Sequence, residues 1–407
     1  MSSLPPSSAA STSAPDLAWV AGEASGDLLG SVVLRGLRAR HSEWTSAGIG
    51  GPQLVAQGFN AWWPSDKLAV RGYVEVLRHY REIVGIREQL KQRLLAAPPR
   101  VFVGVDAPDF NLDLEASLRA QGISTVHLVC PSIWAWRPER VSKLKASVDH
   151  VLCIFPFEPE LLAQHGIAST YIGHPLAPLI PMAPDRSVAR TALGLPADAP
   201  VVALLPGSRR SEVDYLASRF FEAAALILKA QPATHFVLPT LPALRTIVEA
   251  KLQALCRQSA VGRALQGRVT VCNGQSHAAL AACDVTLIAS GTATLEAALF
   301  KRPMVIAYNM NWLSWQIMRR KKLQPWVGLP NILCRDFVVP ELLQDQATPQ
   351  ALADQVLAWF RQPERVAAVQ QRFTALHHTL MRDTEALAAD AIERCMRPAS
   401  PAVGGMA

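Results

Sequence analysis

The feature that most limits the folds open to this chain is an alternation of short apolar runs with longer helical patterns. The runs come in two series, each rich in apolar and β-branched residues. The first series is 17–22, 46–51, 101–106, 126–130, 151–155 and 170–175, and the second is 201–207, 235–239, 269–274, 285–291 and 303–308. Continuous apolar strands interleaved with helices are typical of parallel sheets covered on both faces. The pattern therefore predicts an α/β fold with doubly wound parallel sheets.

A proline-rich segment at 175–187, PLAPLIPMAPDRS, divides the two series. Because 407 residues exceed what one ordinary core holds, we expect two Rossmann-like domains that face each other across a cleft. After Pro349, apolar residues recur at three- and four-residue steps, which predicts amphipathic helices. The expected parts are a disordered tail at 1–15, an N-terminal domain at 16–178, a C-terminal domain at 188–345, C-terminal helices at 346–397 and a loose tail at 398–407.

The composition narrows the class of protein. Half of the residues are hydrophobic and only 18% are charged, which gives a large core and excludes global disorder. The net charge of +7 is spread along the chain, so it favours anionic substrates or an anionic membrane surface over a nucleic-acid partner. The sequence has no run of about 18 apolar residues, so we expect no membrane-spanning segment.

The cysteines and the first residues indicate the compartment. The seven cysteines are scattered singly without a CxxC pair, which is typical of buried thiols in a reducing compartment and argues against a zinc site. Residues 1–16 lack the basic and apolar regions of a signal peptide. We therefore expect a cytosolic protein or one that lies on a membrane surface.

The residues that follow each strand are the informative ones, because ligands of open α/β sheets bind at the carboxyl ends of strands. The stretch AGEASGDLLGS at 21–31 puts Gly22, Ser25 and Gly26 between a strand and a helix, where backbone N–H groups can bind an anion. Its spacing departs from GxGxxG, which argues against a dinucleotide site. Alternatively, it is a tight turn in which Ser25 or Asp27 caps the helix.

A second strand end carries a candidate catalytic carboxylate. In VDAPDFNLD at 105–113, Asp106 ends a strand and Pro108 prevents the strand from continuing. A carboxylate at this position can accept a proton from a sugar hydroxyl. Alternatively, Asp106 forms an Asx-turn and only accepts hydrogen bonds from backbone amides.

Aromatic and imidazole side chains follow two further strands. Trp134 and Trp136 lie beside Arg137 and Arg140, where indoles could stack on a sugar, cover an acyl chain or pack in the core. His174 follows the run at 170–175 and is either a substrate ligand or a hydrogen-bonded structural histidine.

Two turns of the second series together indicate a nucleotide site. In PGSRRSE at 206–212, a new helix offers N–H groups to a phosphate and Arg209 can bind it through two nitrogens. In ASGTATLEAAL at 289–299, Gly291 and Thr292 can contact a second phosphate, and Glu296 can accept both hydroxyls of a ribose. The chain has no GxxxxGK[ST], which excludes a P-loop ATPase.

The segment 67–95 mixes apolar residues with arginines. A basic amphipathic segment of this kind can lie in the headgroup layer of a membrane. The alternative is an ordinary covering helix with a solvated basic face.

These motifs resemble those of the lipid-A-disaccharide synthase family, glycosyltransferase family 19. The matching stretches are AGEASGD, GIGGP, VGVDAPDFN, PSIWAWRPERV, IGHP, LLPGSR with Glu212, SGTATLEA, PMVIAY and LPN at 329–331. They follow the family's order from about Val20 to Leu343, so the resemblance covers most of the chain.

The resemblance implies a GT-B fold and a step of lipid A biosynthesis. The family joins UDP-2,3-diacylglucosamine to 2,3-diacylglucosamine 1-phosphate (lipid X) with inversion, releases UDP, and requires no metal or other cofactor. It implies that Asp106 is the general base, that Arg209 contacts the diphosphate and that Glu296 binds the ribose. Asn331 falls on a donor-site position, and Arg210 stands where the motif varies.

The strand-end positions and the resemblance together give the remaining site residues and partners. Donor-site residues are Gly207, Ser208, Gly291 and Thr292, and those lining the acceptor site or cleft are Glu23, Ser25, Gly26, Asp27, Trp134, Trp136 and His174. Expected membrane contacts are Leu68, Val70, Val74, Val76, Leu77, Arg78 and Arg81. The implied location is the cytoplasmic surface of the inner membrane, with C-terminal helices that pack back on the N-terminal domain and allow a homodimer.

Two other functions remain open from the sequence. A UDP-N-acetylglucosamine 2-epimerase shares this architecture but acts on one soluble nucleotide sugar, so it has no use for the basic apolar segment. A non-catalytic protein of the membrane surface would leave Asp106, Arg209 and Glu296 without a role.

Overall fold

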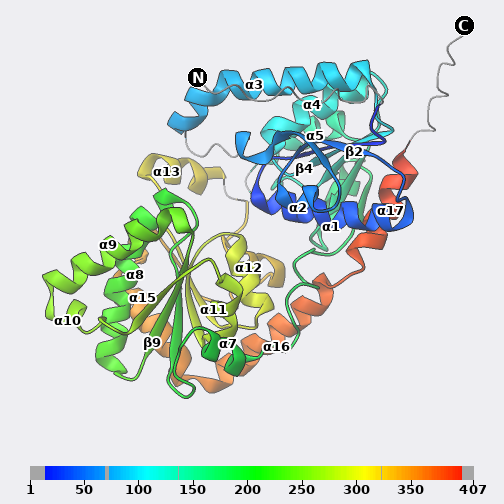
Figure 1. Ribbon diagram of the computed structural model, residues 1–407. Helices are drawn as coiled ribbons and strands as arrows, with labels where there is room; N and C mark the ends of the chain where they lie inside the picture. The colour runs from blue at the N-terminus through cyan, green and yellow to red at the C-terminus, as the bar shows by residue number, and fades with distance from the viewer. Residues whose placement is uncertain (1–13, 69–72, 136, 322, 397–407) are drawn as a thin grey trace, which may run out of the picture. The chain divides into compact units, whose positions relative to one another are not determined.

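The computed structural model describes residues 14–68, 73–135, 137–321 and 323–396. The chain divides into two units, of which the first comprises Met1–Pro175 with Met381–Ala407 and the second Leu176–Leu380. Each unit contains one parallel sheet with helices on both faces (Figure 1). The α/β class with two doubly wound parallel sheets, predicted from the apolar runs, is confirmed.

The first unit is built on a seven-stranded sheet of order β3-β2-β1-β4-β5-β6-β7. Its strands are β1 (Leu17–Ala21), β2 (Ser46–Gly50), β3 (Asn60–Pro64), β4 (Val101–Val105), β5 (Thr125–Leu128), β6 (His150–Cys153) and β7 (Ser169–Tyr171). The central strands β1 and β4 are buried along their whole length because helices cover both faces. They pair in parallel, and the strand order reverses between them.

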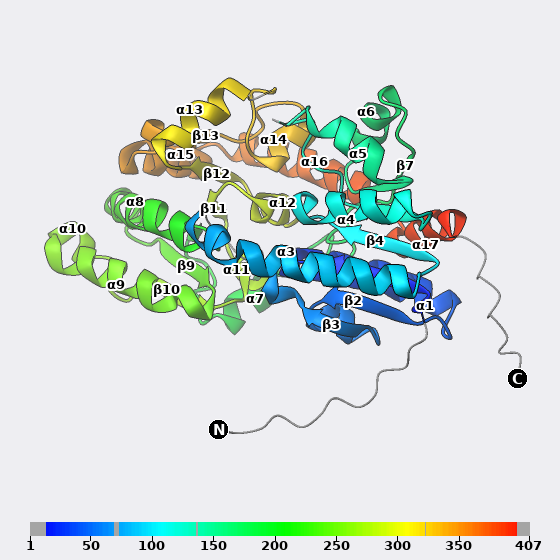
Figure 2. The same cartoon turned by 90° about the horizontal axis from the view of Figure 1, so that it is seen from above.

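Helices cover this sheet on two sides. They are α1 (Ala24–Arg40), α2 (Pro52–Val55), α3 (Tyr73–Ala96), α4 (Pro108–Ala120), α5 (Arg140–Ser147), α6 (Glu158–Gln164) and α17 (Thr384–Cys395). α3, α4 and α5 lie together on one face, the side toward the viewer in Figure 2, and α1 packs with α2 and α17 on the other. Ion pairs bind α17 to α1, from Arg35 to Glu385 at 2.5 Å and from Arg40 to Asp390 at 2.6 Å.

The second unit repeats this design with a six-stranded sheet of order β10-β9-β8-β11-β12-β13. Its strands are β8 (Val201–Leu205), β9 (His235–Thr240), β10 (Val269–Asn273), β11 (Val285–Ala289), β12 (Met304–Tyr308) and β13 (Glu341–Leu343). The order reverses between β8 and β11, which are both buried throughout. Each sheet therefore has one point where the connections that follow two neighbouring strands run to opposite faces of the sheet.

The helices of the second unit include two that the sequence assigned elsewhere. They are α7 (Arg186–Ala192), α8 (Arg210–Ala230), α9 (Pro242–Gln258), α10 (Ala260–Arg263), α11 (Ser276–Ala282), α12 (Thr292–Leu299), α13 (Trp312–Lys321), α14 (Leu329–Cys334), α15 (Pro349–Arg361) and α16 (Pro363–Leu380). The helices 346–397 were expected to pack on the N-terminal domain, but α15 packs on α8 and α16 on α12 and α14. Their apolar faces complete the second core, and α17 packs on the first unit.

The proline-rich linker packs on the second unit. The buried His377 of α16 lies 2.8 Å from the carbonyl oxygen of Ala177, and its other ring nitrogen lies 2.6 Å from Nζ of Lys301. Lys301 also donates to the carbonyl oxygen of Pro181 at 3.4 Å. These contacts hold the linker against α16.

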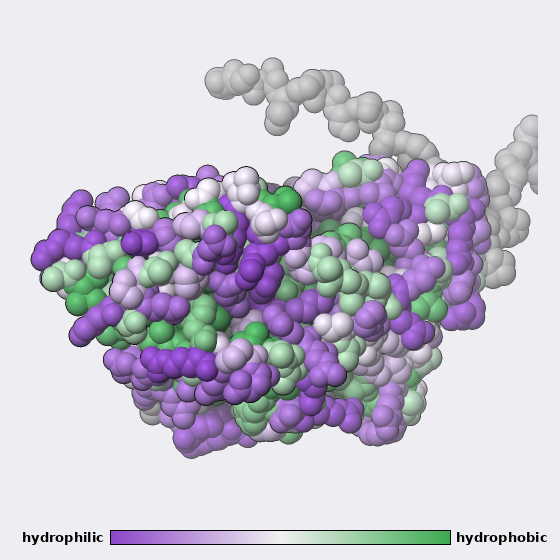
Figure 3. Space-filling model, turned by 90° about the horizontal axis from the view of Figure 1, so that it is seen from below, coloured by the Kyte–Doolittle hydropathy of each residue, from purple (hydrophilic) through white to green (hydrophobic). Residues whose placement is uncertain are grey.

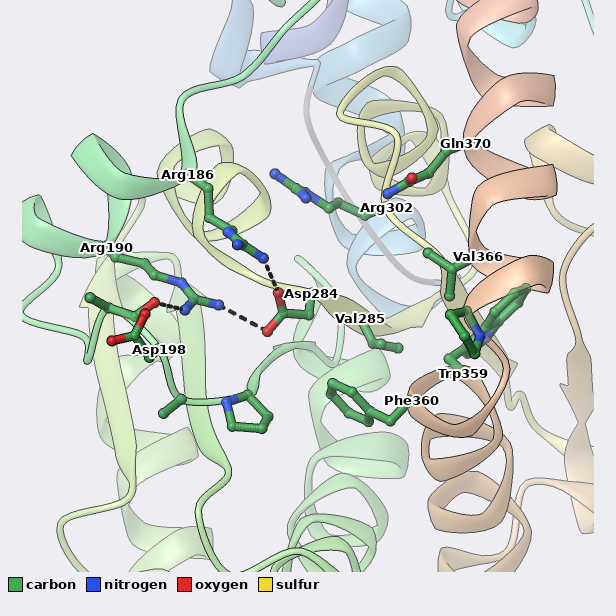
Figure 4. A pocket seen from close by; sticks show the side chains of 14 residues that line it. Arg186, Arg190, Asp198, Asp284, Val285, Arg302, Trp359, Phe360, Val366 and Gln370 are labelled. Atoms are coloured by element: carbon green, nitrogen blue, oxygen red, sulfur yellow. Dashed lines mark hydrogen bonds and ion pairs between the residues drawn. The ribbon is translucent and has the colours of Figure 1, made fainter.

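A cavity of about 440 Å³ lies at the amino-terminal ends of β8 and β11 (Figure 4). The carboxylate of Asp284 lies 2.8 Å from Arg186 and 2.9 Å from Arg190, and it also accepts from the backbone N–H of Val201. These bonds fasten α7 to the sheet. The cavity is at the edge opposite the strand ends where ligands of this fold bind.

The pattern of apolar runs in the sequence did not predict two edge strands, β3 and β13. β3 has the sequence NAWWP with mostly exposed residues, and β13 has three residues, so neither forms the continuous apolar run of a buried strand.

On the face in Figure 3, hydrophobic side chains occur in separate groups among hydrophilic ones. Among the described residues, no helix combines the length and the apolar character that a membrane crossing needs.

Candidate functional site

The two points where strand order reverses carry most of the predicted site residues. In the first unit, the turn after β1 contains Glu23 and Ser25, and the turn after β4 contains Asp106. In the second unit, Arg209 follows β8 and Gly291 follows β11. Because parallel strands end at the same edge, each pair of turns shares one edge of its sheet.

The backbone around Asp106 is strained. Asp106 has φ 48° and Ala107 φ 43°, and Val129, at the end of the neighbouring β5, has φ 78°. Left-handed conformations cost such residues about 1–3 kcal/mol each, and they cluster at functional sites. Nδ2 of the buried Asn111 donates to the carbonyl oxygens of Asp106 at 2.8 Å and Val105 at 3.3 Å, which fixes the turn.

Charged neighbours surround the carboxyl of Asp106. Burial raises the pKa of Asp106 above its ordinary value, while the charge of His127 lowers it, that of Glu23 raises it and that of Arg140 lowers it. Arg140 in turn lies 2.5 Å from the exposed Asp109. A partly buried carboxyl with a raised pKa is a suitable proton acceptor. Sequence reasoning did not assign roles to His127 and Arg140, because their elements are distant from 106 along the chain.

The predicted ligand role of Asp27 conflicts with its environment. Its buried carboxylate accepts from the backbone N–H groups of Gly51 at 2.8 Å, Gln53 at 2.8 Å and Leu54 at 3.1 Å. Asp27 therefore caps the short helix α2. Gly26 is buried against Val105, and Ser25 is exposed in the first turn of α1. In the stretch 21–31, the side chains of Glu23 and Ser25 lie at the carboxyl edge of the first sheet.

Trp134 and His174 lie among aromatic side chains. The indole of Trp134 makes edge contacts with Phe155 and Phe157, and its Nε1 donates to the buried Glu158 at 3.2 Å. His174 is buried beside Phe155, and burial lowers its pKa to about 4. Both side chains take part in the core of the first unit. Trp136 lies outside the described residues.

At the start of α8, a carboxylate already occupies two backbone amides. Glu212 Oε2 accepts from the N–H groups of Ser208 at 2.9 Å and Arg209 at 3.1 Å. Gly207 has φ 125°, and any side chain there would overlap with Glu212. The turn is thus preformed, and the Arg209 side chain is 54% exposed at the sheet edge. The charges of Glu212 and Arg209 both act on Tyr308 at the end of β12, a neighbour that sequence reasoning did not include.

The start of α12 is open. Gly291 and Thr292 are exposed, and a Cβ added at Gly291 would meet no atom within 4 Å. Glu296, one turn into the helix, lies 3.3 Å from the imidazole of His277 on α11. His277 was missed because only the sheet brings α11 and α12 together.

Asn331 has a scaffolding role that the sequence did not predict. The residue is fully buried, its Nδ2 donates to Val339 and Glu341, and its Oδ1 accepts from the N–H of Val339. Glu341 also accepts from the amides of Val327 and Gly328. The hydrogen bonds of the Asn331 side chain therefore tie α14 to Val339 and to Glu341 of β13, and Glu341 in turn holds the turn before α14.

The expected membrane contacts are only partly described. Leu68 packs against the core cluster of the first unit and against Gly22, so it is not free to enter a membrane. Arg81 is exposed on α3. Val70 lies outside the described residues, as do the side chains of Val74, Val76, Leu77 and Arg78.

Known proteins resemble the chain over nearly its whole length. A family model described as lipid-A-disaccharide synthetase matches residues 17–392. A relative named lipid-A-disaccharide synthase from Albidiferax ferrireducens is 65% identical over 94% of this chain and 97% of its own. Another of that name, from Burkholderia pseudomallei, is 51% identical over 95% and 97%.

Solved structures share the fold at low identity. A putative UDP-N-acetylglucosamine 2-epimerase from Listeria monocytogenes matches with a TM-score of 0.60 at 13% identity, over 94% of this chain and 95% of that one. HepE of Anabaena, in complex with UDP and glucose, matches with a TM-score of 0.58 at 16% identity, over 93% and 99%. These two show the GT-B architecture alone, whereas the sequence relatives and the family model show kinship. The chain belongs to the lipid-A-disaccharide synthase family of glycosyltransferases.

Proposed function

We propose that this chain joins UDP-2,3-diacylglucosamine to 2,3-diacylglucosamine 1-phosphate. The products are a β-1′,6-linked disaccharide 1-phosphate and UDP, with inversion at the anomeric carbon. The proposal rests on family membership, and the single observation that carries it is the partly buried, strained Asp106 where strand order reverses. Membership alone would not say which residue does the chemistry.

Asp106 is the general base of this reaction. It takes the proton of the acceptor hydroxyl while that oxygen bonds to the anomeric carbon and the bond to UDP breaks. A raised pKa matches the base better to a weakly acidic hydroxyl, provided that the carboxylate form still predominates. Asn111 and the left-handed turn hold the carboxylate in place.

The donor is held by the second unit. Departing diphosphate carries negative charge, and its stabilisation requires fixed positive groups. The exposed guanidinium of Arg209 and the open first turn of α12 supply them. Glu296 binds the ribose, and Tyr308 borders the diphosphate. We assign Asn331 to holding α14 against Val339 and Glu341.

The test is to incubate the protein with both lipid substrates and detect the disaccharide by mass spectrometry. Asp106→Asn should lower turnover by about 10²–10⁴-fold, because general base catalysis contributes that much, and leave the affinity for UDP unchanged. Asp109→Asn, at an exposed carboxylate three residues away, is the matched control and should retain most activity.

Loss of UDP affinity in Asp106→Asn, or normal turnover, would contradict the assigned role. Conversion of UDP-N-acetylglucosamine without an acceptor would instead favour an epimerase, the function named for the Listeria neighbour.

We also propose that the protein works on the cytoplasmic surface of the inner membrane, because both substrates carry acyl chains that reside in lipid. We propose in addition that α17 can pack on α1 of a second copy, since the same ion-paired contact between two copies would give a homodimer. Size-exclusion chromatography with light scattering would distinguish monomer from dimer.

A further inference from the structure

A buried ion pair lies beside Asp106 that the proposed reaction does not use. His127 of β5 and Glu115 of α4 have no exposed surface, and Nδ1 of His127 lies 2.8 Å from Oε1 of Glu115. His127 stands opposite Gly104 in the register of β4 and β5, two residues before Asp106. A side chain at Gly104 would overlap Glu115, so this glycine makes room for the pair.

A buried Glu–His pair stabilises a core less than well-packed apolar side chains would. Within the described residues, Oε2 of Glu115 and Nε2 of His127 have no hydrogen-bond partner although both are buried. Apolar residues of similar size often replace buried ion pairs without loss of stability. Its place beside the candidate base therefore points to a use in catalysis.

We propose that Glu115 and His127 form a charge-balancing pair that stabilises the carboxylate form of Asp106. Glu115 holds His127 as an imidazolium, and that positive charge favours the ionised form of the neighbouring base. This inference rests on the proposed function, in which Asp106 is the base. His127 touches no substrate and transfers no proton, so it is a positioning residue.

The charges around the two groups agree with this assignment. Burial disfavours the imidazolium, yet the charge and hydrogen bond of Glu115, together with Asp106, raise the pKa of His127. The other charged groups that act on Asp106 are Glu23, from the turn after β1, and Arg140, from α5. Of these neighbours, His127 has the largest effect on Asp106.

The test is the pH profile of kcat/KM for His127→Gln and Glu115→Gln. Removal of the positive charge raises the pKa of Asp106, so the acidic limb should move to higher pH. At a fixed pH on that limb, kcat/KM falls about tenfold for each unit of displacement. The plateau at high pH and the affinity for UDP should remain. His150→Gln, on the neighbouring strand β6 with a partner at Thr170, is the matched control.

An acidic limb that stays in place in folded variants overturns the proposal. If His127→Gln does not fold, ring ¹⁵N resonances of the wild-type protein decide instead. One histidine should stay doubly protonated above its ordinary pKa, and its titration midpoint should fall in Asp106→Asn. A His127 ring that is neutral at every pH would refute the proposed pair. Normal turnover of Asp106→Asn would instead overturn the proposed function, whatever His127 does.

A second observation concerns α13 and is independent of the first. From residue 297 to residue 335 the sequence has no Asp or Glu, and 319–322 are four basic residues in a row. Arg319 and Arg320 are exposed at the end of the helix, Leu323 after it is 56% exposed, and Trp315 and Met318 are partly exposed. Arginines beside indole and aliphatic groups are the side chains that favour the interface of an anionic membrane.

We infer that α13 is a contact surface for anionic lipid. This inference deepens the proposed function by adding a membrane contact on the second unit. Basic residues near an anionic surface gain electrostatic attraction, and partly exposed Trp315 and Leu323 can enter the headgroup layer. A nucleic acid would use the charges but not the apolar groups.

The test is cosedimentation with phosphatidylcholine vesicles with and without phosphatidylglycerol. Binding should require phosphatidylglycerol and weaken with salt, and R319E/R320E should bind about tenfold more weakly. R257E/R263E, with the same charge change at exposed arginines of the second unit, is the control. Equal loss in both variants, or tighter binding to duplex DNA than to vesicles, overturns the inference. Disaccharide synthesis in detergent tests the proposed function separately and should persist in R319E/R320E.

Discussion

Asp106 and Ala107 both adopt left-handed backbone conformations that cost L-residues about 1–3 kcal/mol each. A turn that only linked β4 to α4 would place glycine or asparagine there. The sequence identified Asp106 from its position after an apolar run and before a proline. The strained backbone and the raised pKa distinguish the base from an ordinary Asx-turn, and both come from the folded chain.

Asp27 and Asn331 have hydrogen-bond partners that the sequence did not predict. Both lie in motifs of the family, yet the carboxylate of Asp27 binds amides of residues 51–54 and the amide of Asn331 binds Val339 and Glu341. A polar side chain in a motif can serve the ligand or the loop. The sequence gives no sign of which hydrogen bonds are already occupied.

The buried His174 predicts a specific pH dependence of stability. Burial lowers its pKa to about 4 from an ordinary 6.5, so the unfolded chain binds a proton between these values and the folded protein does not. Folding is therefore destabilised as the pH falls from 6.5 towards 4, by about 1.4 kcal/mol per unit. Urea unfolding at pH 7.5 and pH 5 measures this loss. In His174→Gln the loss should be smaller, and an identical pH dependence in both proteins would show that His174 contributes nothing.

At the scale of elements, the first turns of α8 and α12 differ in how ready they are for an anion. Glu212 takes two amides at the start of α8, which leaves the guanidinium of Arg209 as the main anion contact there. The start of α12 has exposed Gly291 and Thr292. The sequence pattern predicted a phosphate contact at both turns.

The two adjacent arginines of α8 should therefore respond differently to substitution. Arg209→Ala should weaken UDP binding by about ten- to a hundredfold, because a hydrogen bond to a charged group contributes about 1.5–3 kcal/mol. Arg210 is 77% exposed and lies near Asp214, so Arg210→Ala should leave the affinity unchanged. Isothermal titration with UDP gives both values. Equal losses would indicate a general charge effect and not a specific contact.

The packing of α17 on α1 gives a second prediction for elements. A methyl group at Gly36 of α1 would lie 2.7 Å from the carbonyl oxygen of Glu385, so Gly36→Ala must displace α17. We expect a loss of about 1–3 kcal/mol in the free energy of unfolding. Gly85 of α3 has no atom within 4 Å of such a methyl group, so Gly85→Ala should stabilise by up to about 1 kcal/mol. Thermal unfolding compares the two, and a gain in Gly36→Ala would disprove the contact.

At the scale of the whole molecule, the chain passes from one unit to the other twice, after Pro175 and after Leu380. The second unit is continuous in sequence, whereas the first needs α17 from the far end of the chain to cover α1. The core of the second unit therefore forms from one continuous stretch, whereas the first unit also needs the C-terminal end of the described chain.

A chain that ends at Leu380 tests this difference. It lacks α17, so the apolar face of α1 is exposed and the first unit loses stability. The second unit keeps its core and both donor turns, so UDP should bind with nearly normal affinity while disaccharide synthesis disappears. Fluorescence or calorimetric titration with UDP provides the measurement. Loss of UDP binding would mean that the donor site depends on the first unit.

The sequence by itself determined the α/β class, the central strands of both sheets and the turns that carry Asp106, Arg209 and Glu296. These follow from local physics, because a buried strand must be apolar and a strand-to-helix turn must contain small or capping residues. Motif order was enough to indicate the family.

Only the tertiary structure decided which polar side chains are free and which are bound. It paired His127 with Glu115 and Asn331 with Glu341, it used Asp27 as a helix cap, and it placed α15 and α16 on the second unit. Each of these outcomes depends on partners that are distant in sequence and adjacent in space. Hydrogen bonds and burial are satisfied by the whole fold, so the local pattern cannot specify them.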